Sequence, residues 1–374
     1  MSSDLNQTSL EKRRYYPVLD LVRFLAALLI VGVHIFPEGS TTEGIGLDRS
    51  VPTLLGLSFM NACLRIAVPA FFLISGFLLF KKIGDDPEHK WQHIGAFCLR
   101  ILFLHIFWYA VGLPLTIRDI TGFVSQSDTN GLIRYIVITL WKGAPRGYWF
   151  LVSLVLSVVI TASCRSKKSM TVLAVIAGTL YVYGCLNSAY FGIFLLNNDP
   201  VSKAFYQVGE YLELSFCPLQ ALLFVVLGRF FAEHGSFKIK GNAVILPAVF
   251  LLMMGELFLT MYGNLYVYPD AFFSLPIFAF FLMNLLLGIN VENEKFTEVA
   301  KKLKRVGSFS YLFHFQFFCY MHWILDATGN NIFRDQYGWL FIPYLICVAL
   351  CFGLQTLFEY LSKNKYLGFL RYSY

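Results

Sequence analysis

The feature that most constrains this chain is a series of long apolar runs, each of about 20 residues. We count ten, at residues 17–36, 57–80, 93–113, 148–164, 170–186, 214–232, 243–262, 271–289, 308–326 and 338–361. These runs are too long and too continuously apolar for outer-membrane strands, which alternate with a period of two over about ten residues. We therefore predict an all-α, polytopic membrane helical bundle with about ten transmembrane helices.

Composition excludes a soluble body that carries one anchor. Of the 374 residues, 57% are hydrophobic and only 14% are charged, and the mean hydropathy is +0.61. One or two spans would leave most of a chain at ordinary polarity. We expect a single integral-membrane domain over residues 1–374, with a polar cytoplasmic tail at 1–15. The net charge of +7 does not indicate a nucleic-acid partner, because Lys and Arg collect on the cytoplasmic side of membrane proteins.

The basic residues predict the orientation of the chain. With the N-terminus inside, 20 of the 30 Lys and Arg residues fall on the cytoplasmic side and 7 outside. This bias favours cytoplasmic N- and C-termini and an even number of spans. We therefore expect a multi-pass protein of the plasma (inner) membrane. The two longest segments between spans, 114–147 and 187–213, then face outward, and long loops often carry function.

The first apolar run contains two ionisable residues, Arg23 and His34, which are costly inside a span and mark candidate functional sites. Eleven positions return a helix to within about 20° of the same face and advance about 16 Å along its axis. Ala26 and Ala27 between them are expected to leave room for a slender ligand. Each residue taken singly also has a structural explanation: Arg23 can snorkel or pair with Asp20, and His34 can sit in the wet outer interface.

Further polar and aromatic side chains lie inside or at the ends of other apolar runs. The candidates are Arg65, Ser75, Arg100, Tyr148, Trp149, Glu256, Tyr311, His314 and Glu359. Structural roles are open for them too: interface arginines, close helix packing at the serine, an aromatic belt, carboxylate pairing with Arg or Tyr, and an interhelical hydrogen bond from the histidine. The eight cysteines lack metal-ligand spacing and are interpreted as small buried hydrophobes, so we predict no metal site.

Four blocks, in this order, resemble the signature of the membrane acyltransferase 3 family. They are Arg23-x10-His34, R-x-x-V-P-x-F-F-x-x-S-G-F from Arg65 to Phe77, YWFLVSL from Tyr148 to Leu154, and SFSYLFHF from Ser308 to Phe315. The family consists of integral-membrane O-acyltransferases. The resemblance implies transfer of an acyl group, usually acetyl, from cytoplasmic acyl-CoA to a hydroxyl of an extracytoplasmic glycan, glycolipid or other envelope molecule.

The resemblance also implies residue roles, with His34 as the catalytic residue and Arg23 supporting the acyl-CoA donor, expected to be acetyl-CoA. We extend donor binding to Arg65, Ser75 and Arg100. The predicted acceptor or site-lining residues are Tyr148, Trp149, Glu256, Tyr311 and His314. Coenzyme A cannot cross a bilayer, but its thin pantetheine arm is about as long as the rise from Arg23 to His34. Lys81 and Lys82 either bind its phosphates or represent ordinary positive-inside charge.

The predicted mechanism has two forms. Neutral His34 takes the proton of the acceptor hydroxyl as that hydroxyl attacks the thioester, or His34 is itself transiently acylated. The expected partners are acyl-CoA, an extracytoplasmic carbohydrate or lipid-linked acceptor, and membrane lipids. The sequence leaves open which acyl group moves, which molecule accepts it and whether a homo-oligomer forms.

The main competing interpretation is a proton-coupled small-molecule or amino-acid transporter, like the membrane portion of certain racemases that resemble this family. The sequence lacks visible paired half-repeats with matching broken helices, which counts against it. A non-catalytic scaffold or receptor is disfavoured because the external segments are too short for a folded binding domain.

Overall fold

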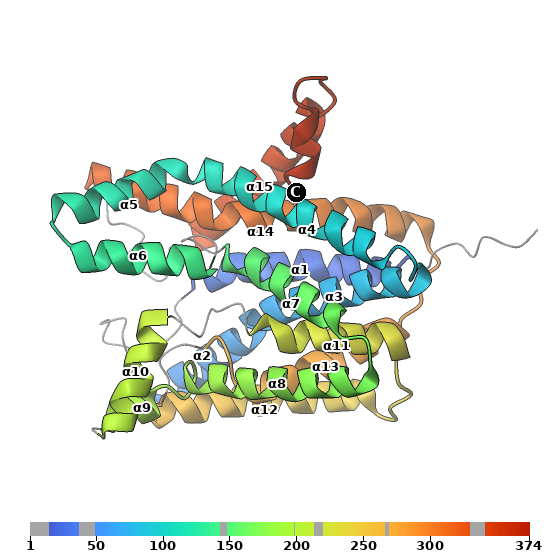
Figure 1. The fold of residues 1–374 in the computed structure, drawn as a ribbon, viewed down its shortest axis with the longest axis horizontal. Helices are drawn as coiled ribbons and strands as arrows, with labels where there is room; N and C mark the ends of the chain where they lie inside the picture. Colours follow the sequence, from blue (N-terminus) through green and yellow to red (C-terminus); the bar gives the residue numbers. More distant parts are fainter. Residues whose placement is uncertain are drawn as a thin grey trace, which may run out of the picture.

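The computed structural model describes residues 15–36, 49–142, 148–197, 199–212, 220–265, 269–329 and 341–374. Within these ranges every regular element is a helix, which confirms the all-α fold class. Most helices run parallel or antiparallel to one long axis (Figure 1). They are α1 (Pro17–Val33), α2 (Val51–Leu64), α3 (Ala67–Asp85), α4 (Lys90–Val111), α5 (Leu113–Ser125), α6 (Thr129–Lys142), α7 (Trp149–Ser163), α8 (Lys167–Leu186), α9 (Gly192–Leu196), α10 (Pro200–Leu212), α11 (Ala221–His234), α12 (Asn242–Tyr262), α13 (Ser274–Gly288), α14 (Glu294–Thr328), α15 (Phe341–Leu361) and the short 3-10 helix η3 (Gly368–Tyr372).

Five helical stretches are long and apolar enough to cross a membrane. They are Val51–Asp85, Lys90–Val111, Lys167–Leu186, Asn242–Tyr262 and Phe341–Leu361, and Trp149–Ser163 and Ser274–Gly288 are shorter apolar helices. Each of the ten predicted runs overlaps a helix, but ten crossing helices are not confirmed. The described part of α11 begins only at Ala221, and residues 214–219 of its predicted run lie outside the described residues.

Two helices differ from the predicted boundaries, one because of a distant ion pair and one because of a local cap. The run at 57–80 is interrupted where α2 ends at Leu64, and Arg65 there is drawn toward Asp270 by an ion pair. Helix α14 begins at Glu294, well before the predicted 308, because Asn293 caps it by accepting a hydrogen bond from the Phe296 N–H. A search for apolar runs detects only the apolar part of such a long helix and misses its polar first turns.

The segments predicted to connect spans on the outside contain helices of their own. Helices α5 and α6 form a hairpin that extends the end of the bundle, and α9 and α10 lie at the same end (Figure 1). The hydrophobic periodicity of α5 and α10 is that of amphipathic helices, with apolar and polar faces, rather than of spans.

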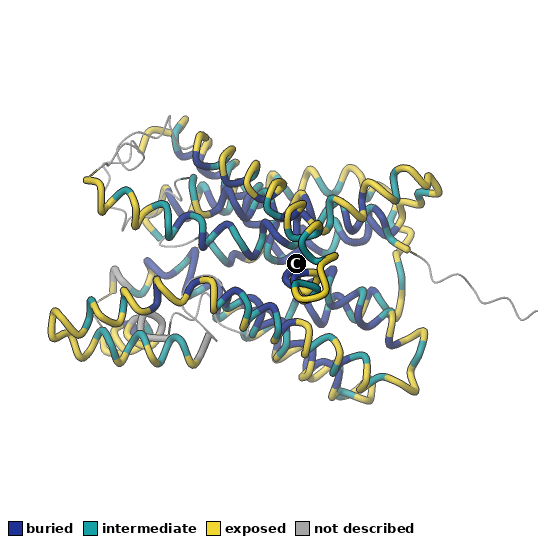
Figure 2. The backbone as a smooth tube through the Cα atoms, turned by 90° about the horizontal axis from the view of Figure 1, so that it is seen from above, coloured by how far each residue is buried: buried dark blue, intermediate teal, exposed yellow. Residues whose placement is uncertain are grey.

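The centre of the bundle is formed by α1, α3, α11 and α14. Helix α1 packs mainly against α14 and α3, and α3 packs mainly against α11. Figure 2 shows buried backbone through the centre of the molecule and exposed residues on the outer helices. Large apolar side chains are among those exposed on the outer helices, including Leu99, Ile106, Val175, Leu251, Leu259 and Leu345. An outer surface of this kind suits lipid rather than water, consistent with a multi-pass membrane protein.

Two cationic side chains donate hydrogen bonds to the backbone carbonyl groups at the C-terminal end of α7, which would otherwise lack donors. Lys90 Nζ donates to the Ala162 carbonyl at 2.5 Å. Arg229 Nη1 donates to the carbonyls of Thr161 (2.6 Å) and Cys164 (2.9 Å). These contacts tie α4 and α11 to α7 at one end of the bundle.

We predict that Gly228→Ala destabilises the protein, because α3 and α11 approach backbone to backbone. A Cβ atom at Gly228 would lie 2.5 Å from the Leu73 carbonyl oxygen and 2.7 Å from the Phe77 nitrogen. Overpacking of this kind costs about 1–3 kcal/mol, read as a lower thermal unfolding midpoint in detergent. The control is Gly178→Ala in α8, whose Cβ would meet nothing within 4 Å; equal midpoints for the two variants would contradict the prediction.

Candidate active site

A cavity of about 530 Å³ opens between α1, α3, α4, α7 and α14. Four cationic side chains line it, one from each of four helices: Arg23, Lys82, Arg100 and Lys304. We call it the cationic cavity. Helices α1, α4 and α14 run in one direction and α3 and α7 in the other (Figure 1). Arg23 and Lys304 lie in the first half of α1 and α14 and Lys82 lies late in α3, so these three share one end. Arg100, at the middle of α4, is close enough to interact electrostatically with Arg23 and Lys304.

Asp20 supplies negative charge to this cluster from within the protein. Its carboxylate Oδ1 lies 3.7 Å from Arg23 Nη1 and 3.2 Å from Lys304 Nζ, and its Oδ2 accepts a hydrogen bond from the Tyr15 hydroxyl. Burial lowers the pKa of Lys304, and the Asp20 charge opposes that change. Because Asp20 faces two of the four cations, the cavity keeps an excess of positive charge and suits an anionic ligand.

The mouth of the cavity carries further polar contacts. His93, which lines the cavity, and His89 bond to the two carboxylate oxygens of Asp86, each at 2.8 Å. These bonds hold the pKa of Asp86 below its usual value. Arg100 Nη2 donates to the Tyr374 carbonyl oxygen at 3.1 Å. His93 thus adds a histidine whose ring is already oriented by a carboxylate.

The other end of the cavity is apolar and aromatic. Its wall includes Phe71, Leu104, Phe150, Leu154, Tyr311 and Leu312. The Tyr311 ring packs against Phe150 and Phe71, with centroids 4.8 and 5.2 Å apart. Residues Lys304 and Tyr311 are seven positions apart on α14, about 10 Å along the axis. The cavity therefore runs from a charged mouth to an aromatic end.

Two histidines lie beyond this aromatic end. The ring of His34, the residue that ends α1, is 5.1 Å from the ring of His314 and 4.9 Å from that of Phe315, centroid to centroid. The His314 ring is in turn 6.1 Å from the Tyr311 ring. His314 is buried, whereas His34 is exposed. The order in space is cavity, Tyr311, His314, His34, and His34 is not among the residues that line the cavity.

A second, smaller pocket of about 40 Å³ adjoins Val33, next to His34. Arg65 and Asp270 line it as a buried ion pair, together with Gln220, Trp149 and Tyr181. Phe72, also in its wall, stacks on Phe150 of the cationic cavity with centroids 4.3 Å apart. We call it the ion-pair pocket. An aromatic stack therefore separates the two pockets.

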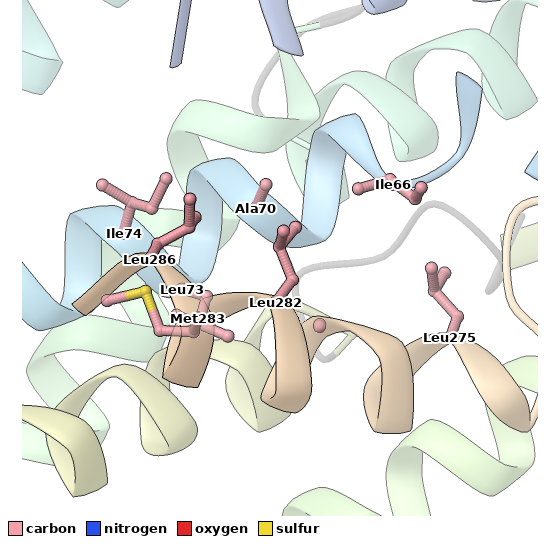
Figure 3. Close-up of a pocket in the computed structure, with 9 residues that line it drawn as sticks. Ile66, Ala70, Leu73, Ile74, Leu275, Leu282, Met283 and Leu286 are labelled. Carbon is pink, nitrogen blue, oxygen red and sulfur yellow. The ribbon is translucent and has the colours of Figure 1, made fainter. Parts of the chain in front are cut away.

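Figure 3 shows a third pocket, between α3 and α13, that carries no chemistry. Its lining is wholly apolar and includes Leu73, Leu275, Leu282 and Met283. Its volume of about 10 Å³ is that of a packing gap. Across the described ranges, no three His, Cys, Asp or Glu side chains gather as a metal site would require.

The structure brings together part of the predicted donor group. Arg23, Ser75 and Arg100 line the cationic cavity, whereas Arg65 lies in the ion-pair pocket. The prediction grouped Arg65 with these three residues, but the structure does not. Its ion pair with Asp270 holds Arg65 at the N-terminal end of α3, away from the cationic cavity. The pairing of Arg23 with Asp20 that the sequence allowed is present.

The predicted acceptor and site-lining residues separate into three places. Tyr311 lines the cationic cavity, with His314 behind it, and Trp149 lines the ion-pair pocket. Buried Tyr148 ties α4 to α14: it accepts from Gln316 Nε2 at 2.5 Å and donates to the Trp108 carbonyl at 3.4 Å.

Glu256 lies elsewhere, on α12, and its carboxylate reaches the N-terminal end of α13. Its carboxylate accepts the N–H groups of Phe273 (2.6 Å) and Ser274 (2.8 Å), the Ser274 hydroxyl (2.5 Å) and the Tyr190 hydroxyl (2.8 Å). Two of these donors are helix N-terminal amides that need an acceptor. This is the structural role that the sequence left open for Glu256. Glu359 likewise pairs with Arg305, at 2.6 Å.

One further expectation differs from the structure, and the two lysines whose role was left open take different places in it. Ala26 and Ala27 do not leave a channel beside α1, because both are buried in its packing against neighbouring helices. Lys81 does not line the cavity; it pairs with Asp85 at 3.3 Å, while its neighbour Lys82 lines the cavity. Successive helical residues point about 100° apart, so only one of two adjacent lysines can face the site.

Sequence reasoning missed several residues of the site. Lys304 was counted only as cytoplasmic charge, and Asp270, Gln220 and His93 were not singled out. Lys304 lies seven residues before Tyr311 on the same helix, a spacing that returns close to the same face. That spacing was a usable signal. Asp270 offered none, since its partner Arg65 is 205 residues away.

The fold and site define a multi-helix membrane protein in which a cationic cavity leads to a pair of histidines. The chain belongs to the acyltransferase 3 family: the family model described as an acyltransferase domain matches residues 16–352. Membership supports an acyltransferase enzyme. No solved structure matches the chain.

Curated relatives carry the names of racemases. An amino-acid racemase of Enterococcus faecalis is 26% identical over 282 residues, covering 74% of this chain and 36% of the relative. A second amino-acid racemase of that organism is 19% identical, with 72% and 37% covered. A serine/alanine racemase of Enterococcus gallinarum is 23% identical over 359 residues, with 91% and 45% covered. The chain thus spans less than half the length of these relatives.

We predict that Asp20→Asn destabilises the protein by about 2 kcal/mol, the usual loss of a hydrogen bond to a charged group, because it leaves the partly exposed Arg23 and Lys304 without their shared, buried carboxylate. Asp85→Asn is the matched control: Asp85 pairs with Lys81 at 3.3 Å, with both side chains exposed, and such pairs contribute about 0–1 kcal/mol. The measurement is the thermal unfolding midpoint of each variant in detergent. A larger loss at Asp85 than at Asp20 would refute the account of the cluster.

Proposed function

We propose that this protein transfers an acyl group, expected to be acetyl, from cytoplasmic acyl-CoA to a hydroxyl of an extracytoplasmic glycan, glycolipid or other envelope molecule. The observation that carries the proposal is the form of the cationic cavity. It has four cations at one end and aromatic walls at the other, and its aromatic end adjoins the histidine pair through Tyr311. Family membership supports the reaction type.

The cavity suits the two parts of an acyl-CoA. Phosphate groups of the donor bind Arg23, Lys82, Arg100 and Lys304, and the arginines can contact phosphate oxygens in pairs. The pantetheine arm lies along the apolar wall and carries the thioester toward Tyr311. Because His34 does not line the cavity, the thioester has to pass the Tyr311 ring to react there.

In the proposed reaction His34 is the general base. It takes the proton of the acceptor hydroxyl while the hydroxyl oxygen bonds to the acyl carbonyl carbon. The carbon–sulfur bond breaks, and the departing thiolate takes the proton back from His34, giving the acyl ester and free CoA. Transient acylation of His34 is the alternative form of the same transfer.

The proposed topology places the ten predicted spans across the membrane with both termini in the cytoplasm. In this topology α1 and α14 both start on the cytoplasmic side. The mouth of the cationic cavity is then cytoplasmic, because Arg23 and Lys304 lie in the N-terminal halves of these two helices. His34, the ion-pair pocket and the α5–α6 hairpin then lie toward the outside. Trp149 in that pocket offers an aromatic face of the kind that sugars pack against.

A second candidate function is amino-acid transport. The names of the relatives favour it, since they act on amino acids and match this chain over less than half of their length. The buried Arg65–Asp270 pair would offer a partner for each end of an amino acid. A transporter takes up labelled serine or alanine into proteoliposomes without consuming acyl-CoA, and such uptake, with no acyl transfer, would replace the proposed function.

We predict that Lys82→Gln and Arg23→Ala each weaken acyl-CoA binding about tenfold or more, because each removes a charge-assisted contact to phosphate. Binding is measured by calorimetry on purified protein. The matched control is Lys81→Gln, since Lys81 neighbours Lys82 in sequence but pairs with Asp85 instead of lining the cavity. Donor affinities that fall equally for Lys81→Gln and Lys82→Gln would show that general positive charge, not the cavity, attracts the donor.

We predict that His34→Ala lowers acceptor-dependent release of CoA by about two to four decades, the usual effect of losing a general base. Acyl-CoA binding should remain close to wild type, because His34 lies outside the cavity. Release is followed with a thiol reagent over a panel of hydroxylated acceptors. Release at the wild-type rate by the variant would remove His34 from the mechanism.

A further inference from the structure

The protonation of the His314 ring is set by one hydrogen bond. Its Nδ1 lies 3.0 Å from the Ser310 carbonyl oxygen, one turn earlier on α14. A carbonyl oxygen only accepts, so Nδ1 is the donor and carries the proton. In the neutral ring the other nitrogen, Nε2, is therefore a bare acceptor.

The Nε2 atom of His314 is buried and has no hydrogen-bond partner in the part of the chain that the structure describes. His314 is only 3% exposed, and its Nε2 makes no hydrogen bond to a described residue. A buried polar atom left unpaired costs about 1–3 kcal/mol, so such an atom in a native protein calls for an explanation. The other rings against His314 are those of Tyr311, Phe315 and Phe318. The one further ring that packs against it among the described residues is that of His34, 5.1 Å away at an angle of 31°.

We propose that His314 is the positioning residue for His34: when the exposed His34 ring turns toward it from its adjacent place, the His314 Nε2 accepts a hydrogen bond from one ring N–H of His34. This bond fixes which His34 nitrogen keeps its lone pair and turns that nitrogen away from His314, toward the incoming hydroxyl. The proposal rests on the proposed function, in which His34 is the base.

The bond persists through the proposed reaction. When His34 takes the hydroxyl proton, both of its ring nitrogens carry hydrogen, and the one facing His314 still donates to Nε2. The proton that His34 gained then passes to the thiolate of CoA. His314 gains and loses no proton, because its Nδ1–H stays bonded to Ser310 and its Nε2 only accepts.

Helix α14 explains why this arrangement is rigid. This one helix of 35 residues carries Lys304 at the mouth of the cavity, Tyr311 at its aromatic end, and His314, the proposed hydrogen-bond acceptor for His34. A single helix therefore sets the distance between the donor site and the base. Preorganisation of this kind is what a positioning residue supplies.

Two substitutions separate positioning from packing. In His314→Gln the amide oxygen can reach the place of Nε2 and accept from His34, while the bond to Ser310 is lost. In His314→Asn the amide nitrogen can keep the bond to Ser310, while the atom that faces His34 is lost. We expect acceptor-dependent CoA release to stay within about tenfold of wild type for Gln and to fall about 100-fold or more for Asn, with the KM for acyl-CoA unchanged in both. A purely structural His314 gives the reverse order and overturns the proposal.

The double variant His34→Ala/His314→Asn tests whether His314 acts through His34. We expect it to have the same residual rate as His34→Ala alone, since residues that act as a unit are not additive. Independent, multiplying losses overturn the proposal. If the wild-type protein shows no acceptor-dependent CoA release, the proposed function itself is overturned, and the positioning role of His314 falls with it.

A spectroscopic measurement covers the case in which His314→Asn does not fold. In protein labelled with [15N]histidine, we expect one ring of wild type to show a protonated Nδ1 and a bare Nε2, and its Nε2 resonance to move in His34→Ala. A His314 ring protonated at Nε2, or an Nε2 resonance that does not respond to loss of His34, overturns the proposal.

Discussion

The contact between α1 and α14 is the interaction on which the candidate active site depends. Gly307 of α14 lies against the backbone of Phe24 in α1, where a Cβ atom would come within 2.8 Å of the Phe24 Cα. At one end of this contact Asp20 of α1 holds Lys304 of α14. At the other end His34 of α1 faces His314 of α14. One helix pair thus sets both the charged mouth of the cavity and the histidine pair.

Charge and burial explain the division of the site. Cations inside a membrane bundle are costly unless they are paired or reach water. At the cavity mouth four of them share little negative charge from the protein, which leaves them able to bind an anion. In the ion-pair pocket Arg65 is instead balanced by Asp270. The same residue type therefore attracts a ligand in one place and holds the fold together in the other.

The sequence predicted the parts of this account that depend on local periodicity. The helix class and the placement of a helix at each apolar run follow from the length and periodicity of those runs. Contacts between distant segments did not follow. The break at Arg65 depends on Asp270, and the burial of Ala26 and Ala27 depends on α14 and α3. A single sequence carries no signal for such pairings, and His93 was missed as a cavity residue for this reason. Lys304 differs, because its seven-residue spacing from Tyr311 on one helix could have pointed to it.

In the proposed function an acyl group crosses from a donor at the cationic cavity to an acceptor on the opposite side of the membrane. The most direct test uses proteoliposomes with the protein in known orientation, acyl-CoA labelled in its acyl group on one side only, and a hydroxylated acceptor on the other. The account predicts labelled acceptor and free CoA on opposite sides, only when acyl-CoA faces the Lys82 side. Two results would contradict this transfer. One is labelled acceptor whichever side of the membrane holds acyl-CoA, and the other is no labelled acceptor across a broad panel while serine or alanine is transported.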